Sequence, residues 1–176
     1  MAKTPQTIST ETVFKGKIFD IRIDTIREGE LEYKREIVVH QGSAVVVPVF
    51  DDGTVALVRQ YRHATGGVQL ELPAGGIEPG ETFEQAAARE LEEEIGFRAG
   101  RIEKLTEFYV SPGFLTEKMH VFLATELTES TQKLDEDEIV EVVRLPLTEA
   151  IEMTKDGRIE DAKTIIGLTF ATILRP

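Results

Sequence analysis

The stretch Gly75–Phe97, GGIEPGETFEQAAARELEEEIGF, joins a glycine-rich turn to a segment that is crowded with carboxylates. Thr82 is followed three residues later by Gln85, which is the capping-box pattern of a helix start. Gly96 stands where a left-handed C-terminal residue is expected. The spacing therefore predicts a helix over residues 83–95. Its apolar side chains recur every four residues, as one stripe that can pack on a sheet.

Carboxylates occupy the other faces of this predicted helix. Glu90 and Glu94 are one turn apart and Glu93 follows Glu90 by three residues, so these side chains share one edge. Like charges at this spacing repel, and Arg89 is the only cation within residues 83–95. The acidic run by itself favours a solvated helix face. A hard divalent cation is the alternative partner, because Mg²⁺ takes oxygen ligands and also binds substrate phosphates.

A longer pattern decides between these two interpretations. Residues of defined type stand at fixed spacing through the whole stretch: Gly75, Glu81, Arg89, Glu90, Leu91, Glu93, Glu94, Gly96 and Phe97. This pattern resembles the Nudix box at every defined position, which makes it far more specific than a lone glycine motif. The resemblance to the Nudix hydrolases implies that the carboxylates bind metal rather than solvent.

Composition and charge limit the possible partners. The chain has 176 residues, 20 Lys and Arg against 32 Asp and Glu, and a net charge of −12, which argues against nucleic acid as the main ligand. An anionic substrate needs metal ions and local arginines to cover its phosphates. The sequence contains no cysteine, so disulfides and thiolate metal sites are excluded. No apolar run reaches membrane-spanning length, and we expect a cytoplasmic protein without a membrane partner.

The N-terminal region predicts a pair of exposed strands. Residues 13–26 alternate apolar and polar side chains, and a turn at residues 28–30 leads to a second run over residues 31–40. Such a hairpin has too little core to be stable alone, so it must pack on the main domain or on a second subunit. We therefore expect an N-terminal strand region over residues 1–42 and a main domain over residues 43–176.

The main domain reads as alternating strands and helices. Strands are predicted over residues 44–50, 54–61, 69–73, 101–110, 117–125 and 139–145. Residues 129–138 are polar and acidic and predict a loop, Thr148 is the expected cap of a short helix that ends near Gly157, and residues 162–174 have helical spacing. The fold class is α+β with a mixed sheet, and the family resemblance implies an α/β/α sandwich.

A proline marker extends the resemblance to one branch of the family. Pro112 lies sixteen residues beyond Gly96, the spacing found in ADP-ribose pyrophosphatases, and the resemblance places Pro112 and Gly113 at the substrate. It implies hydrolysis of ADP-ribose to AMP and ribose 5-phosphate. A nucleotide sugar, a dinucleoside polyphosphate or an oxidised nucleotide is an alternative substrate. A ligand-sensing domain without catalysis is the alternative from another class, although such sensors usually lose box residues.

The resemblance also assigns roles within the box. Glu90 and Glu94 are implied as the principal Mg²⁺ ligands, with Glu93 assisting and the Ala74 carbonyl contributing from the loop; Mn²⁺ or another divalent ion is an alternative metal. Arg89 is implied to orient the carboxylates, and an ion pair between Arg89 and Glu81 is the structural interpretation of the same residue.

Residues outside the box complete the implied site. Glu136 matches the position of the family's general base, and Glu138, two residues away, is the alternative. Arg62 is implied to contact the diphosphate or the terminal ribose, and Glu117 a ribose hydroxyl. The N-terminal strands are implied to be exchanged in a homodimer. They would bring two candidates for stacking on adenine, Phe19 and Arg35, although Phe19 is equally explained as dimer core.

Overall fold

A computed structural model describes residues 4–134 and 138–174, and the chain divides into two compact units. The first unit contains residues 1–42 and 108–118, and the second contains residues 43–107 and 119–176. None of the helices in the described ranges has the length and apolar character needed to cross a membrane. The second unit carries the box, residues 75–97.

The N-terminal part of the first unit consists of three antiparallel strands. They are β1 (Gln6–Lys15), β2 (Asp20–Glu28) and β3 (Leu31–Val39), in the order β1-β2-β3. The β2–β3 pair confirms the predicted hairpin. β1 was not predicted as a separate strand, because the alternating pattern of residues 13–26 covers its end and most of β2. Between β1 and β2 the chain turns at Gly16, whose N–H donates to the Phe19 carbonyl at 3.1 Å. A Cβ at residue 16 would lie 2.6 Å from that carbonyl oxygen. A turn this tight requires glycine.

The second unit contains the remaining strands in two sheets, ordered β10-β5-β6 and β7-β4-β9-β8. Their bounds are β4 Ser43–Pro48, β5 Thr54–Arg62, β6 Gly67–Glu71, β7 Ala74–Gly76, β8 Phe97–Tyr109, β9 Lys118–Glu129 and β10 Val140–Pro146. β4 pairs in parallel with β9 and antiparallel with β7, so the sheet is mixed as predicted. The pairing with β7 fixes the start of the box beside a fully buried strand.

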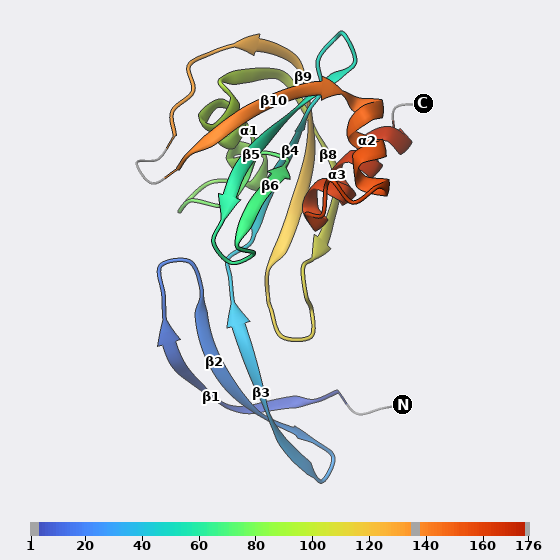
Figure 1. The fold of residues 1–176 in the computed structure, drawn as a ribbon. Helices are drawn as coiled ribbons and strands as arrows, with labels where there is room; N and C mark the ends of the chain where they lie inside the picture. The colour runs from blue at the N-terminus through green and yellow to red at the C-terminus, as the bar shows by residue number, and fades with distance from the viewer. Residues whose placement is uncertain (1–3, 135–137, 175–176) are drawn as a thin grey trace. The chain divides into compact units, whose positions relative to one another are not determined.

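Helices cover both faces of the sheet around β4, with α1 (Phe83–Ile95) on one side and α2 (Leu147–Lys155) and α3 (Ala162–Leu174) on the other (Figure 1). Successive β4 residues alternate between the two faces. Val46 belongs to the apolar cluster that includes Leu91 of α1, while Val47 packs near Gly167 of α3. This is the α/β/α sandwich that the sequence predicted.

α1 has the bounds that its caps predict. The Thr82 hydroxyl accepts from the Gln85 N–H, and the Gln85 side chain accepts from the Thr82 N–H, which completes the capping box. Gly96 ends the helix in the left-handed region with φ 73°. α3 also matches its predicted bounds.

The predicted cap of α2 is wrong. Thr148 was expected to cap this helix, but α2 begins at Leu147, one residue earlier, and Pro146 occupies the cap position without a side-chain hydrogen bond. Pro146 has φ −55°, which suits a helix start, and the Leu147 N–H donates to the Gly53 carbonyl at 3.1 Å. A backbone acceptor from another turn therefore replaces the side-chain cap.

Candidate active site

Arg89 is the centre of the charge network on α1. Its guanidinium donates to Glu81 at 2.9 and 3.1 Å, to Glu90 at 2.6 Å and to Glu93 at 2.9 Å. It also donates to the Gly76 carbonyl at 2.9 Å, which ties the helix to β7. These contacts confirm the predicted pair with Glu81 and show that one cation holds three box carboxylates at once.

The loop before the helix fits closely around Glu90. A Cβ added at Gly75 would lie 2.0 Å from Glu90 Oε1 and 2.3 Å from its Cδ, so only glycine leaves space for this carboxylate. Next to it, the Ala74 N–H donates to Glu94 Oε2 at 3.3 Å. β7 and the last turns of α1 therefore form a cradle for the Glu90 and Glu94 carboxylates; the Ala74 carbonyl as a metal ligand stays a prediction.

Glu90 and Glu94 are the buried acids of this cradle, with only 8% and 3% of their surface exposed. Burial raises the pKa of Glu90 to about 7, against the favourable charge of Arg89. Burial, reinforced by the charges of Glu90 and Glu138, raises the pKa of Glu94 to about 8. The ionised forms of Glu90 and Glu94 are thus less stable than those of solvated acids, because Arg89 does not offset the burial of both carboxylates.

The donor set fits a hard divalent cation by its chemistry. Within the described residues, no group of three or more His, Asp and Glu side chains is already gathered around a point where a metal could sit. Glu90 and Glu93 are instead turned to Arg89. Carboxylate oxygens in a glycine-lined cradle, two of them buried with raised pKa values, are nonetheless what Mg²⁺ favours. A cation there would compete with Arg89 for these oxygens.

The loop glutamates lie on either side of a gap in the described residues. Glu136 falls outside the described ranges, so its predicted role as the base stays a prediction. Glu138 is described and half-buried, and its charge raises the pKa of both Glu90 and Glu94. Glu138 is therefore close enough to the cradle to influence it electrostatically.

Arg62 lies at the end of β5 in the same unit. Its Nε and Nη2 donate to the two oxygens of Glu71, each at 2.8 Å. Arg62 and Glu94 also favour each other's ionised forms, so the guanidinium is within electrostatic reach of the cradle. The position fits the predicted contact with an anionic substrate.

Five predicted substrate residues belong to the first unit: Phe19, Arg35, Pro112, Gly113 and Glu117. Phe19 is 40% exposed, and the Arg35 guanidinium lies 4.3 Å from the centre of the Tyr33 ring. Phe19 is thus accessible and Arg35 already packs on an aromatic ring, whereas Glu117 is largely buried, 3.7 Å from His40 Nδ1. The assignment of all five residues to the substrate stays a prediction.

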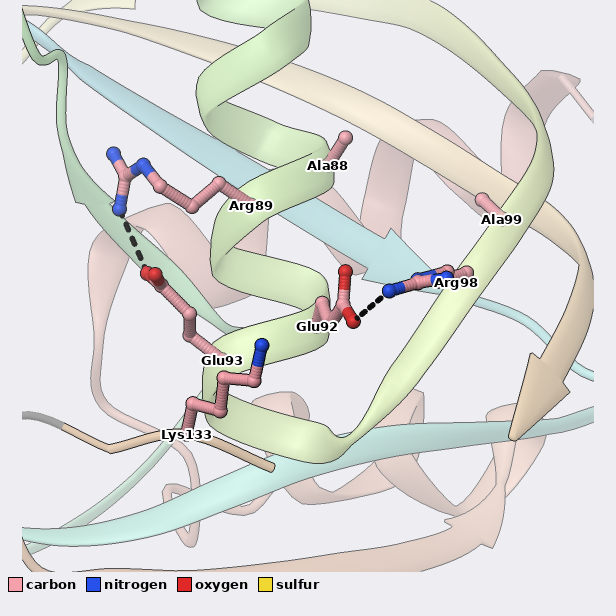
Figure 2. A pocket seen from close by; sticks show the side chains of 7 residues that line it. All are labelled: Ala88, Arg89, Glu92, Glu93, Arg98, Ala99 and Lys133. Atoms are coloured by element: carbon pink, nitrogen blue, oxygen red, sulfur yellow. Dashed lines mark hydrogen bonds and ion pairs between the residues drawn. The ribbon is translucent and has the colours of Figure 1, made fainter. Parts of the chain in front are cut away.

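A hollow of about 360 Å³ lies beside α1, between Glu93 and Arg98 of β8 (Figure 2). Arg89 and Glu93 meet on one side of the helix, and Glu92 meets Arg98 on the other at 2.6 Å. Glu92 also accepts from the Ser130 hydroxyl, and these two donors lower its pKa to about 2. Glu92 is therefore a structural acid that ties α1 to its neighbours, unlike Glu90 and Glu94.

Glu71 and Lys163 form an ion pair beside Arg62 that the sequence did not predict. Glu71 ends β6 with 3% of its side chain exposed, and the Lys163 Nζ of α3 donates to its Oε2. A glutamate directly before Leu-Pro-Ala-Gly was a usable signal, because a buried carboxylate requires a cationic partner. The partner is 92 positions away in the chain and could not be identified from local spacing.

Comparison with known proteins shows the family of the chain. The NUDIX domain matches residues 39–167. An ADP-ribose pyrophosphatase from Bacillus subtilis (strain 168) is 41% identical over 94% of this chain and 91% of its own length. A methanol dehydrogenase activator from Bacillus methanolicus is 38% identical with the same coverages.

A solved structure gives the same result for the fold. The crystal structure of an ADP compounds hydrolase superposes with a TM-score of 0.88, at 25% identity, over 99% of this chain and 95% of that one. The matched domain includes the whole cradle, the helix that carries its carboxylates, and Arg62. By its box, its fold and its relatives, this chain belongs to the Nudix hydrolase family.

Proposed function

We propose that the chain hydrolyses the diphosphate of ADP-ribose to AMP and ribose 5-phosphate, with Mg²⁺ as the metal and Mn²⁺ or another divalent ion as a substitute. The observation that carries the proposal is the pair of buried carboxylates on α1: Glu90 lies against Gly75, which leaves space for it, and Glu94 accepts from the Ala74 N–H. The substrate is supported by the relative from Bacillus subtilis, which is named as an ADP-ribose pyrophosphatase.

Glu90 and Glu94 would hold the metal, with Glu93 assisting and the Ala74 carbonyl completing the protein ligands. Such an ion supplies charge neutralisation for a diphosphate and lowers the pKa of a coordinated water. Arg89 keeps the carboxylates in place, because its guanidinium contacts both Glu90 and Glu93 while Glu81 fixes its other edge. The chain's own contribution is thus a set of oxygen donors, of which Glu90 and Glu94 are buried and Glu90 and Glu93 are held by Arg89.

A loop glutamate would accept the proton of the attacking water. Glu138 is supported by its charge, which raises the pKa of both Glu90 and Glu94. Glu136 is the residue that the family resemblance favours. A carboxylate is suited to this role because a general base has to be ionised at the working pH and within reach of the water.

Arg62 would bind the anionic part of the substrate, because its guanidinium lies within electrostatic reach of Glu94. The first unit would bind the nucleoside, with Phe19 and Arg35 at the adenine and Glu117 at a ribose hydroxyl. Pro112 and Gly113 would shape the same region through the turn that they form.

A homodimer is proposed with this function. The first unit exposes large apolar side chains, among them Val13 at 50%, Phe14 at 49% and Ile18 at 72%, and a second copy of the chain would bury them. A stable monomer in light scattering at micromolar concentration would remove both the dimer and any substrate contact from a partner subunit. A cytoplasmic location is consistent with a nucleotide-derived substrate.

The test of the proposed function is product analysis of the purified protein with Mg²⁺. The panel is ADP-ribose, NADH, a dinucleoside tetraphosphate, a nucleotide sugar and an oxidised purine nucleotide. We expect AMP and ribose 5-phosphate from ADP-ribose, with the highest kcat/KM of the panel. A higher kcat/KM for another compound would keep the metal chemistry and discard the substrate, and no hydrolysis of any compound would favour a ligand-sensing role.

A further inference from the structure

A cluster of four charged side chains, of which Glu71 and Lys163 are buried, connects α3 to the ends of β5 and β6. Glu71 is its centre, with Arg62 on both carboxylate oxygens and Lys163 on Oε2. Lys163 is 10% exposed at its side chain and also lies 3.1 Å from Asp161. The cluster contains two cations and two carboxylates, so its charges balance only while Lys163 is present.

The start of α3 fixes Lys163 in this position. Asp161 accepts from the Thr164 N–H at 2.9 Å and so caps the helix, and the Thr164 hydroxyl accepts from the Leu72 N–H at 2.7 Å. Leu72 follows Glu71 directly. The helix start is therefore bonded to the strand that leads into the cradle, and Lys163 is held against Glu71 from a rigid element.

Arg62 is the exposed member of the cluster, with 40% of its side chain accessible. Glu71 occupies its Nε and Nη2, which fixes the guanidinium plane, while no hydrogen bond to Nη1 is found in the part of the chain that the structure describes. Arg62 borders a hollow of about 530 Å³, together with Gln69, Asp161 and Lys163. A planar donor that is fixed along one edge can offer its other edge to an anion.

Lys163 determines whether the charge of the Arg62 guanidinium can still attract an anionic group to the hollow. Glu71 alone would neutralise Arg62, and Asp161 would add a further negative charge at the same hollow. Lys163 offsets one of these two carboxylates. Its removal would leave two carboxylates facing one guanidinium, which would repel an anionic group from the hollow.

We propose that Lys163 is a positioning residue for substrate binding, which holds Glu71 so that Arg62 presents a fixed cationic edge to the anionic part of the substrate, in a cluster that carries no excess negative charge. The inference rests on the proposed function for the identity of the substrate. The proposal predicts that removing the positive charge of Lys163 weakens substrate binding and that removing a negative charge from the cluster strengthens it. An ion cluster with only a structural role predicts a change in stability alone.

The first test is Lys163→Met, which removes the charge and keeps most of the volume. We expect KM for ADP-ribose to rise about tenfold while kcat changes less than about threefold, and Lys163→Arg to restore most of the affinity. Lys155→Met is the matched control, because Lys155 is 62% exposed and, among the residues that the structure describes, forms its ion pair with Glu152 on the surface of α2. Unchanged KM in a folded Lys163→Met would overturn the proposal, whatever its Tm.

The second test, Asp161→Asn, remains informative even if Lys163→Met does not fold. Asparagine caps a helix about as well as aspartate, so the start of α3 is kept while one negative charge is removed. We expect KM to fall by about two- to threefold, the opposite sign to Lys163→Met. A KM that stays the same or rises would contradict the charge argument.

A binding measurement separates this inference from the proposed function. If the wild-type chain does not hydrolyse ADP-ribose, the proposed function fails, and inorganic pyrophosphate with Mg²⁺ then serves as the probe in isothermal titration calorimetry. We expect Lys163→Met to bind pyrophosphate about tenfold more weakly than the wild type. Equal binding, or no binding to the wild type, would overturn the role of Lys163.

Discussion

The substitution Gly75→Ala tests the cradle directly, because the adjacent Gly76→Ala provides a matched control. An alanine Cβ at residue 75 would lie 2.0 Å from Glu90 Oε1, far inside the 3.4 Å at which ordinary van der Waals contact begins. At residue 76, no heavy atom of the described residues lies within 4 Å of such a Cβ. Neither glycine has a positive φ, so alanine adds no backbone strain at either position.

The magnitude follows from what has to move. The Glu90 carboxylate must shift by more than 1 Å, and a displacement of about 1 Å at a reacting centre costs on the order of 10²-fold in rate. Because the clashing atoms are the end of a side chain rather than backbone, we expect a stability loss of only about 1 kcal/mol, or roughly 2–4 °C in Tm.

Steady-state hydrolysis of ADP-ribose with saturating Mg²⁺, together with calorimetric Tm values, measures both effects. We expect kcat/KM to fall about a hundredfold in Gly75→Ala and to stay within about twofold of the wild type in Gly76→Ala. A folded Gly75→Ala protein with wild-type activity would refute the reasoning, because Glu90 would then not need its position against the loop.

Three further predictions concern the carboxylates. Glu94→Gln should keep the fold and lower kcat by orders of magnitude, since an amide is a poor Mg²⁺ ligand; retained turnover would remove Glu94 from the metal site. Glu138→Gln and Glu136→Gln, compared at saturating substrate, should differ, with the base variant losing more than about tenfold in kcat; if neither does, the base lies elsewhere. Without metal, the raised pKa values of Glu90 and Glu94 mean that the folded state binds more protons than the unfolded state, so stability should fall as pH rises from about 4.5 to about 8. Added Mg²⁺ has to displace these protons at low pH, so it should raise Tm more at pH 8 than at pH 6 in scanning fluorimetry, and an equal rise at both would contradict the assignment.

The elements that the sequence predicts well are those with local signals. α1 begins and ends where Thr82, Gln85 and Gly96 predict, because capping involves residues only a few positions apart. The same locality made the box predictable, since its carboxylates share a single helix. The start of α2 was missed because the Gly53 carbonyl, and not Thr148, satisfies its first turn. Side-chain capping patterns cannot reveal an acceptor that comes from a distant turn.

The residues of the candidate site likewise fall into those with local sequence signals and those that only the fold brings together. Arg89 and its acids were predictable from spacing, whereas the contact between Glu71 and Lys163 joins residues that only the folded sheet and α3 bring together. Charge composition gave no warning of this pair, because buried ion pairs are rare among the many charged residues of an acidic chain. Tertiary contacts also decide that Glu92 is structural while Glu90 and Glu94 are buried against β7.

The position of the acids on α1 is itself an argument for function. Carboxylates in the C-terminal half of a helix face the negative end of its dipole, and α1 has no basic residue in its last turn. Glu94 adds to this the cost of burial, with a backbone N–H at 3.3 Å as its hydrogen-bond donor. A sequence that only had to fold would place lysine or a neutral residue at these positions. Side chains that lower local stability are expected where a bound ligand supplies the opposite charge. On α1 the charge that is needed is positive. The same reasoning explains why Arg89 is bonded to three acids and the loop carbonyl at once. It holds Glu90 and Glu93 together, but the burial of Glu94 is offset only in part, by Arg62 and the Ala74 N–H, and a divalent cation would remove this deficit of positive charge.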